Sequence, residues 1–92
     1  MNSVGIEDVV NNEVSMSLYP NPAKESTTLT INGLDKEATM TISDELGRTI
    51  QKITIAANET SKTINTSNLA SGVYYIKVVN DKQTKTQKLI VR

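Results

Sequence analysis

The 92-residue sequence contains no cysteine and no histidine, and it has only three aromatic residues. Without cysteine, neither a disulfide framework nor a thiolate metal site holds the chain together. Without histidine, the chain lacks the commonest metal ligand and the commonest general base at neutral pH. No window approaches the roughly 20 apolar residues that a membrane-spanning helix needs. We therefore expect no metal, no cofactor and no enzymatic activity.

The formal net charge is zero, but the two halves of the chain differ in sign. Residues 1–45 carry eight acidic and two basic side chains, a net charge of −6, and residues 46–92 carry two and eight, a net charge of +6. A nucleic-acid-binding surface needs its positive charge on one face together with stacking aromatics. We expect strands from both halves to interleave and mix the signs, so we predict a mixed, solvated surface and no nucleic-acid partner.

Residues 1–15 show no sustained period and lack the basic and apolar regions of a signal peptide. We interpret them as a linker, so that residues 16–92 form one module of a longer protein. From position 16 onward, short runs rich in Thr, Ile and Val alternate with turn residues, which is typical of β-structure. The predicted strands are residues 16–19, 27–32, 38–43, 49–57, 60–66, 72–80 and 84–92.

Alternation within these runs indicates one face on a core and one in water. Ile50 is out of phase with Ile53 and Ile55, and a bulge near Gln51-Lys52 would restore the phase. The run 60–66 is mostly polar and suits an edge or a lightly buried strand, whereas the run 72–80 is the most apolar and suits a central strand. About seven such strands predict a single all-β domain, an immunoglobulin-like antiparallel β-sandwich, with a small barrel as the alternative.

The residues of two loops predict the conformation that each loop adopts. Asp44-Glu45-Leu46-Gly47 predicts a hairpin loop on a type I turn, with the Asp44 carboxylate accepting backbone amides and Gly47 supplying a positive φ. Read instead as catalytic or metal-binding, Asp44 and Glu45 are too close together to bracket a scissile bond and too few for calcium. In the second loop, we expect Leu69 to cap the core and Gly72 to allow a tight or left-handed turn.

The tyrosine after this second loop is expected to face inward. A buried Tyr74 would direct its hydroxyl at a backbone group, in the manner of a tyrosine corner. Tyr75 then faces the opposite side, so the two rings do not form one platform for a sugar or a base.

Tyr19-Pro20-Asn21-Pro22 marks the start of the domain. The two prolines remove two amide donors and favour extended geometry at Tyr19 and Asn21. A central strand does not tolerate this, but an edge segment does. We interpret the prolines as a boundary between linker and fold.

Four motifs in order carry a family resemblance: Tyr19-Pro20-Asn21-Pro22, Asp44-x-x-Gly47-Arg48, Leu69-x-x-Gly72-x-Tyr74 and Lys88-Leu89-Ile90-Val91. Together they resemble the type A carboxy-terminal sorting domain of cargo proteins exported by the type IX secretion system of Bacteroidota.

The resemblance implies a non-catalytic signal at the end of a secreted enzyme or adhesin. The cargo would cross the periplasm and the outer membrane to the cell surface or the medium, using the outer-membrane translocon and shuttle components. A sortase-like surface protease would then cut the linker within about residues 2–16, and the cargo would be anchored or released. Carried over to this chain, the recognition residues are Asp44, Gly47, Arg48, Leu69, Gly72, Tyr74, Lys88, Leu89, Ile90 and Val91.

The terminal strand suits recognition by strand addition if its edge is open. Lys85, Lys88 and Arg92 either steer it toward an acidic partner or protect the edge against aggregation, and the sequence leaves both interpretations open. An open edge also allows an edge-strand homodimer. The alternative function is an accessory adhesive or carbohydrate-binding sandwich, which requires exposed aromatics on one face.

Overall fold

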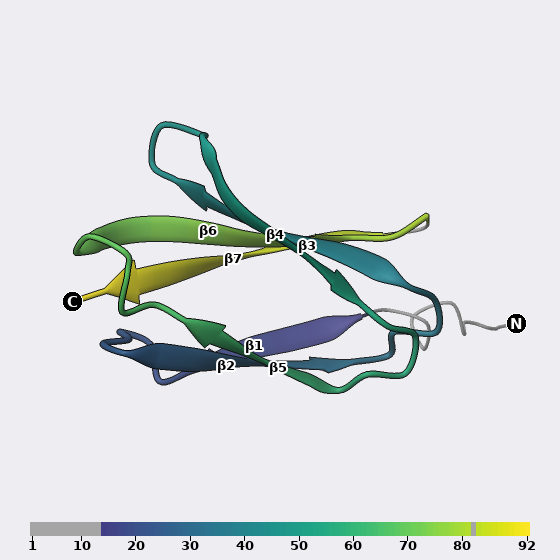
Figure 1. Cartoon of the computed structure of the whole chain (residues 1–92). Coiled ribbons are helices and arrows are strands. Elements are labelled where there is room, and N and C mark those ends of the chain that lie inside the picture. Colours follow the sequence, from purple (N-terminus) through teal and green to yellow (C-terminus); the bar gives the residue numbers. More distant parts are fainter. Residues whose placement is uncertain (1–13, 82) are drawn as a thin grey trace, which may run out of the picture.

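The computed structural model describes residues 14–81 and 83–92, and all of its regular elements in these ranges are β-strands. The strands are β1 (Ser15–Tyr19), β2 (Ser26–Asn32), β3 (Ala38–Asp44), β4 (Thr49–Ile55), β5 (Ser61–Asn65), β6 (Gly72–Val79) and β7 (Thr84–Val91). They form two antiparallel sheets stacked as two layers, one in the order β1-β2-β5 and one in the order β4-β3-β6-β7 (Figure 1). The predicted all-β, immunoglobulin-like sandwich is confirmed.

The position of each strand follows its composition. The most apolar strand, β6, lies between β3 and β7, and the mostly polar β5 is an edge, as predicted. The chain crosses between the layers after β2, β4 and β5, so strands distant in sequence become neighbours. These crossovers bring β3 beside β6 and so fix the relative positions of the two loops described above.

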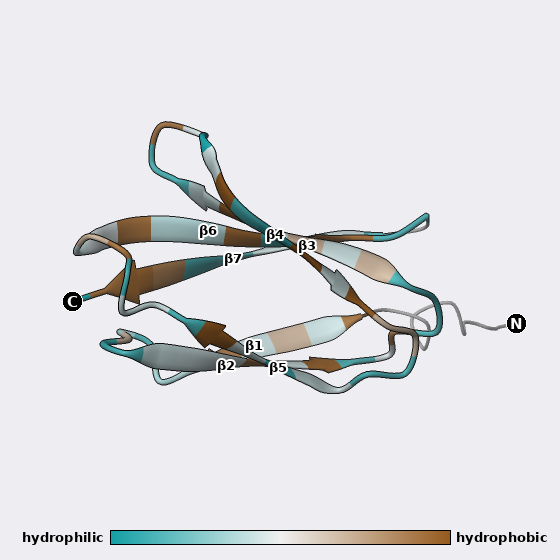
Figure 2. Cartoon of the chain, viewed as in Figure 1, coloured by the Kyte–Doolittle hydropathy of each residue, from teal (hydrophilic) through white to brown (hydrophobic). Residues whose placement is uncertain are grey.

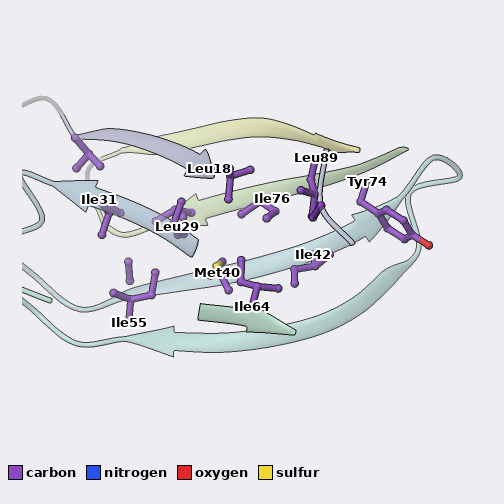
Figure 3. Packing of buried hydrophobic residues seen from close by; sticks show 14 of the residues in the cluster. Leu18, Leu29, Ile31, Met40, Ile42, Ile55, Ile64, Tyr74, Ile76 and Leu89 are labelled. Atoms are coloured by element: carbon purple, nitrogen blue, oxygen red, sulfur yellow. The ribbon is translucent and has the colours of Figure 1, made fainter. Parts of the chain in front are cut away.

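The core lies between the two sheets and comes from the inward-facing positions of every strand (Figure 3). Hydropathy alternates along several strands in the same way (Figure 2). Burial of each such Leu or Ile contributes about 1.5–3 kcal/mol to stability. The largest fully buried hydrophobic side chains are Leu29, Ile31, Met40, Ile42, Ile55, Ile64, Ile76 and Leu89.

The irregularity in β4 lies one residue earlier than predicted and has a different effect. Ile42 pairs with Gln51 and Ser43 pairs with Thr49, so Ile50 is the extra residue. The register shift does not bring Ile50 into the core, because that side chain is 45% exposed. Of the three isoleucines, only Ile55 is fully buried, while Ile53 packs partly against the core. The turn that joins β3 and β4 rises away from the three-stranded sheet (Figure 1), and the first four residues of β4 are exposed, so this end of β4 has no layer to pack on.

The expectation that charges would mix on the sheets is wrong for the outer face of the four-stranded sheet. Strands from both halves do share that sheet. However, β3 is its one strand from the acidic half, and its outward positions hold only threonine and serine. The charged residues that alternation and register place on this face are all basic, namely Lys52, Lys77 and Lys88.

Candidate functional site

The four motifs lie together at the end of the sandwich that also holds the carboxy terminus (Figure 1). In the strand register, Asp44 pairs with Tyr74, and Tyr74 pairs with Leu89. The side chain of Asn21 in turn hydrogen-bonds the backbone of Lys88, which is 67 positions away in sequence. The fold therefore joins four separate segments into one composite site.

The first part of this site is the hairpin turn after β3, which Asp44 organises. Its Oδ1 accepts hydrogen bonds from the amides of Leu46 (2.9 Å) and Arg48 (3.0 Å), and its carbonyl accepts one from the amide of Gly47 (3.0 Å). Its Oδ2 accepts a bond of 2.8 Å from Nε of Arg48. Gly47 has a φ of 85°, the left-handed conformation that glycine adopts without steric cost. The predicted carboxylate-capped turn is confirmed.

These contacts set the electrostatics of the turn. Desolvation raises the pKa of Asp44, but the hydrogen bonds from the Arg48 amide, the Arg48 side chain and the Leu46 amide outweigh it. The pKa of Asp44 therefore lies below its ordinary value of 3.8, and the carboxylate is ionised at neutral pH. With its oxygens occupied in this way, Asp44 maintains the shape of the turn.

The second part is the loop before β6, which Tyr74 fastens to the core. The Tyr74 ring is buried, and its hydroxyl donates a 2.6 Å hydrogen bond to the carbonyl of Ala70. Figure 3 places this ring at the end of the core, with its oxygen directed outward. Leu69 packs partly against the core, as expected for a cap. Gly72, with a φ of 158°, leads into β6, and a Cβ there would meet no other atom within 4 Å.

A surface hollow of about 230 Å³ lies between the turn and this loop. Its lining combines the two motifs, since it includes Asp44, Leu46 and Arg48 from the turn and Gly72 and Tyr74 from β6. The Arg48 side chain remains 73% exposed despite its bond to Asp44. Arg48 is therefore accessible at the rim, while Asp44 and Tyr74 hold the walls in place.

The third part is the domain-start segment, which binds the terminal strand. The side-chain amide of Asn21 donates to the carbonyl of Lys88 (2.9 Å), and its Oδ1 accepts from the amide of Ile90 (3.0 Å). Ala23 continues the contact: its amide donates to the carbonyl of Ile90, and its carbonyl accepts from Arg92, both at 2.8 Å. Tyr19-Pro20 and Asn21-Pro22 are both cis peptide bonds.

This clasp, formed by Asn21 and Ala23, corrects two expectations. Strand addition at the terminal strand requires an open edge, but residues 88–92 already bond to the clasp along that edge. The prolines were interpreted only as a boundary, yet the asparagine between them contacts the end of the chain. Because the two prolines have no amide donor, the Asn21 side-chain amide supplies the donor toward Lys88, and its Oδ1 adds an acceptor for the Ile90 amide.

The terminal motif divides between the core and the surface. Leu89 and Val91 are buried, Lys88 is exposed and Ile90 is half-buried. Only Lys88 and Ile90 of this motif therefore present side chains to a partner from the folded domain. Leu89 and Val91 keep the strand in register.

Two buried threonines support the site and were not singled out from the sequence. Thr27 donates from its hydroxyl to the carbonyl of Pro20 (2.8 Å), and Thr66 donates to the carbonyl of Lys24 (3.1 Å). Both are fully buried and tie the domain-start segment to the three-stranded sheet. Alternation in phase with Leu29 predicts that Thr27 is buried, but no local pattern predicts the burial of Thr66.

Comparison with known proteins defines the family. Residues 17–92 match the family described as secretion system C-terminal sorting domain. The chain belongs to this family. The family resemblance drawn from the four motifs, that of a type IX secretion sorting domain, is thus confirmed. No curated protein matches the chain.

The fold of this sorting domain also occurs within a solved structure, the crystal structure of dimeric latent PorU from Porphyromonas gingivalis. The TM-score is 0.62 at 19% sequence identity, over 85% of this 92-residue chain and 9% of the PorU chain. At this identity the likeness concerns the fold, and the domain spans a small part of PorU.

In the described part of the sorting domain, no group of three or more His, Cys, Asp or Glu residues is placed to hold a metal ion. Likewise, residues 14–81 and 83–92 include no helix with the length and hydropathy to cross a membrane.

Proposed function

We propose that this domain is a non-catalytic sorting signal, which directs a fused cargo protein through the type IX secretion system and across the outer membrane. The cargo precedes the domain, passes through the periplasm and reaches the cell surface or the medium. The outer-membrane translocon and its shuttle components recognise the composite site formed by the four motifs.

We further propose that a sortase-like surface protease removes the domain after export, and that the cargo is then anchored or released. Cleavage falls in the linker assigned to residues 1–15, within about residues 2–16. Residues 1–13 lie outside the described part of the chain, whereas Ser15 and Met16 belong to β1.

The observation that carries the proposal is the family match over residues 17–92. The four motifs lie within this range and meet at one end of the sandwich. A signal must leave side chains accessible to a partner. Arg48 and Lys88 are exposed at this end, while Asp44 and Tyr74 are bound within the fold. This division fits a recognition surface better than a catalytic one, because the carboxylate of Asp44 is occupied in holding the turn.

The test is export of a periplasmic reporter fused to residues 1–92 in a host with type IX secretion. We expect the wild-type fusion at the cell surface or in the medium and expect deletion of residues 88–92 to retain the reporter in the periplasm. Because the deletion also removes Leu89 and Val91 from the core, Lys88→Ala is the matched variant, and circular dichroism checks that it folds. Undiminished export of the deleted form contradicts the proposal.

No observation favours the alternative, a carbohydrate-binding sandwich. Tyr19 and Tyr75 are the exposed tyrosines, and alternation places them on the outer faces of different sheets. They do not form a common platform for a sugar. Affinity for a polysaccharide that disappears in Tyr75→Ala would support the alternative.

A further inference from the structure

Leu46 is the most exposed aliphatic side chain among the large hydrophobic residues described, at 79% exposure. It lies in the turn between β3 and β4, which projects away from both sheets (Figure 1) and carries an apolar segment at its tip (Figure 2). The turn itself does not require leucine, because Gly, Asn, Asp and Ser are the residues that turns favour. Burial does not require it either, so Leu46 has no evident role within the domain.

Two further large hydrophobic residues are exposed near this turn. Ile50, the extra residue of the β3–β4 register shift, is 45% exposed, and Tyr75 on the neighbouring β6 is 40% exposed. Ser43 connects the two in the register, since it pairs with Tyr75 on one side and with Thr49 on the other. Two strand spacings separate Thr49 from Tyr75, about 10 Å. We define the hairpin patch as Ile50 and Tyr75 together with Leu46 of the adjoining turn.

The surroundings of the hairpin patch are basic. Lys88 pairs directly with Tyr75, and Lys77 follows Tyr75 by two residues on the same face. Lys52 lies in the same row as Lys77, with Thr41 between them. No Asp or Glu occupies an outward position of these four strands, and Glu45 is the acidic neighbour in the turn.

The turn that presents Leu46 is held in one shape before any partner binds. Asp44 bonds the Leu46 amide itself, as well as the amide and side chain of Arg48. An anchor that is already ordered loses little conformational entropy on binding. Apolar anchors surrounded by a polar rim are the usual anatomy of a protein interface, and tyrosine is enriched there.

We propose that the hairpin patch is a docking surface for an acidic protein partner, with Leu46 inserted into an apolar pocket and the lysines facing carboxylates around it. This inference rests on the proposed function, since the partner is a component of the export machinery. It also reassigns roles within the motif Asp44-x-x-Gly47-Arg48. Asp44 and Gly47 are positioning residues, and Leu46 between them contacts the partner.

The test uses the reporter fusion with residues 1–92 and compares two variants. Leu46→Asn removes the apolar anchor, and we expect export to fall about tenfold or more, the loss typical of an interface hot spot. Leu46→Met keeps an apolar side chain, and we expect export close to the wild type. The thermal midpoint of both purified variants should stay close to that of the wild type, because Leu46 is 79% exposed and contributes little burial to the fold.

Charge is tested separately by Lys52→Glu with Lys77→Glu, which reverses two charges beside the patch. The control, Lys24→Glu with Lys36→Glu, makes the same change of net charge outside the strands of this face. We expect the first pair to reduce export and the second to leave it near the wild type. Equal effects of the two pairs would show a general charge effect and overturn the acidic partner.

The outcomes separate this inference from the proposed function. If the wild-type fusion is exported and Leu46→Asn is exported equally well, the docking surface is wrong while the sorting function stands. If the wild-type fusion itself stays in the periplasm, the proposed function fails first. If Leu46→Asn lowers the thermal midpoint, its effect on export does not test the docking surface. The comparison of the two lysine pairs then provides the test, because side chains on the solvent face are replaced without loss of core packing.

Discussion

Replacement of Asn21 by alanine tests whether the domain-start segment and the terminal strand form one structural unit. The substitution removes both side-chain hydrogen bonds to β7, to the carbonyl of Lys88 and from the amide of Ile90. It leaves the two backbone bonds of Ala23, to Ile90 in β7 and to Arg92 just after it, in place. The clasp is thereby weakened without removal of either proline.

The expected loss follows from these two contacts. A hydrogen bond of this kind contributes about 0.5–1.5 kcal/mol net, and both groups are solvent-exposed, so water replaces part of what is lost. We therefore expect Asn21→Ala to lower the free energy of unfolding by about 1–2 kcal/mol. For a domain of this size, each kcal/mol corresponds to roughly 4–8 °C in the thermal midpoint.

Asn21→Asp sharpens the experiment because it preserves the size of the side chain. Its carboxylate still accepts from the Ile90 amide, but it loses the donor and faces the Lys88 carbonyl with negative charge. We expect this variant to be at least as destabilised as Asn21→Ala. The assays are urea unfolding and amide hydrogen exchange, in which the Ile90 amide of the alanine variant should lose protection before the amides of β6.

Two results would refute the reasoning. Unfolding free energies that stay within a few tenths of a kcal/mol of the wild type in both variants would mean that the clasp contributes nothing to stability. Unchanged protection of the Ile90 amide in Asn21→Ala would mean that the side chain is not its partner.

Two more predictions concern the loop anchor and pH. Tyr74→Phe removes the hydrogen bond to the Ala70 carbonyl, and we expect a loss of about 1 kcal/mol in chemical denaturation, with no change for Tyr75→Phe as the exposed control. We expect the free energy of unfolding to fall as the pH drops below 4.5, the ordinary pKa of Glu59, and to fall further below 3.8, the ordinary pKa of Asp44. In the folded state, hydrogen bonds lower the pKa of both carboxyl groups, and for Glu59 the main one comes from Lys62. The unfolded chain therefore takes up protons at a higher pH than the folded chain, and acid favours unfolding. A urea midpoint that rises between pH 5 and pH 3 would contradict this.

Local chemistry in the sequence predicts a large part of the fold. Alternation places Leu29, Ile31 and Met40 in the core, because each lies in a strand with one wet face. The turn at Asp44 is equally predictable, because its carboxylate caps amides only two and four residues away. Tyr74 behaves as expected for the same reason, since its hydroxyl reaches a carbonyl four residues back.

What the sequence does not predict depends on contacts between distant segments. The bond between Asn21 and Lys88 spans 67 positions, and nothing near either residue indicates the other. The exposure of Ile50 has a similar origin, because it depends on the register between β3 and β4, in which Ile50 is the extra residue. The basic outer face also required the strand order, since it arises from which strands share a sheet.

The contacts within the four motifs bear on how a sorting signal of this kind is read. Three motif side chains hydrogen-bond the backbone of the domain itself, namely those of Asp44, Tyr74 and Asn21. An unfolded chain contains the same motif residues but lacks the spatial arrangement that these hydrogen bonds create. On the proposed function, the machinery therefore reads the shape of one end of a folded sandwich. Any variant that unfolds the domain should then block export even when every motif residue is intact, which makes a stability measurement the necessary companion of each export assay.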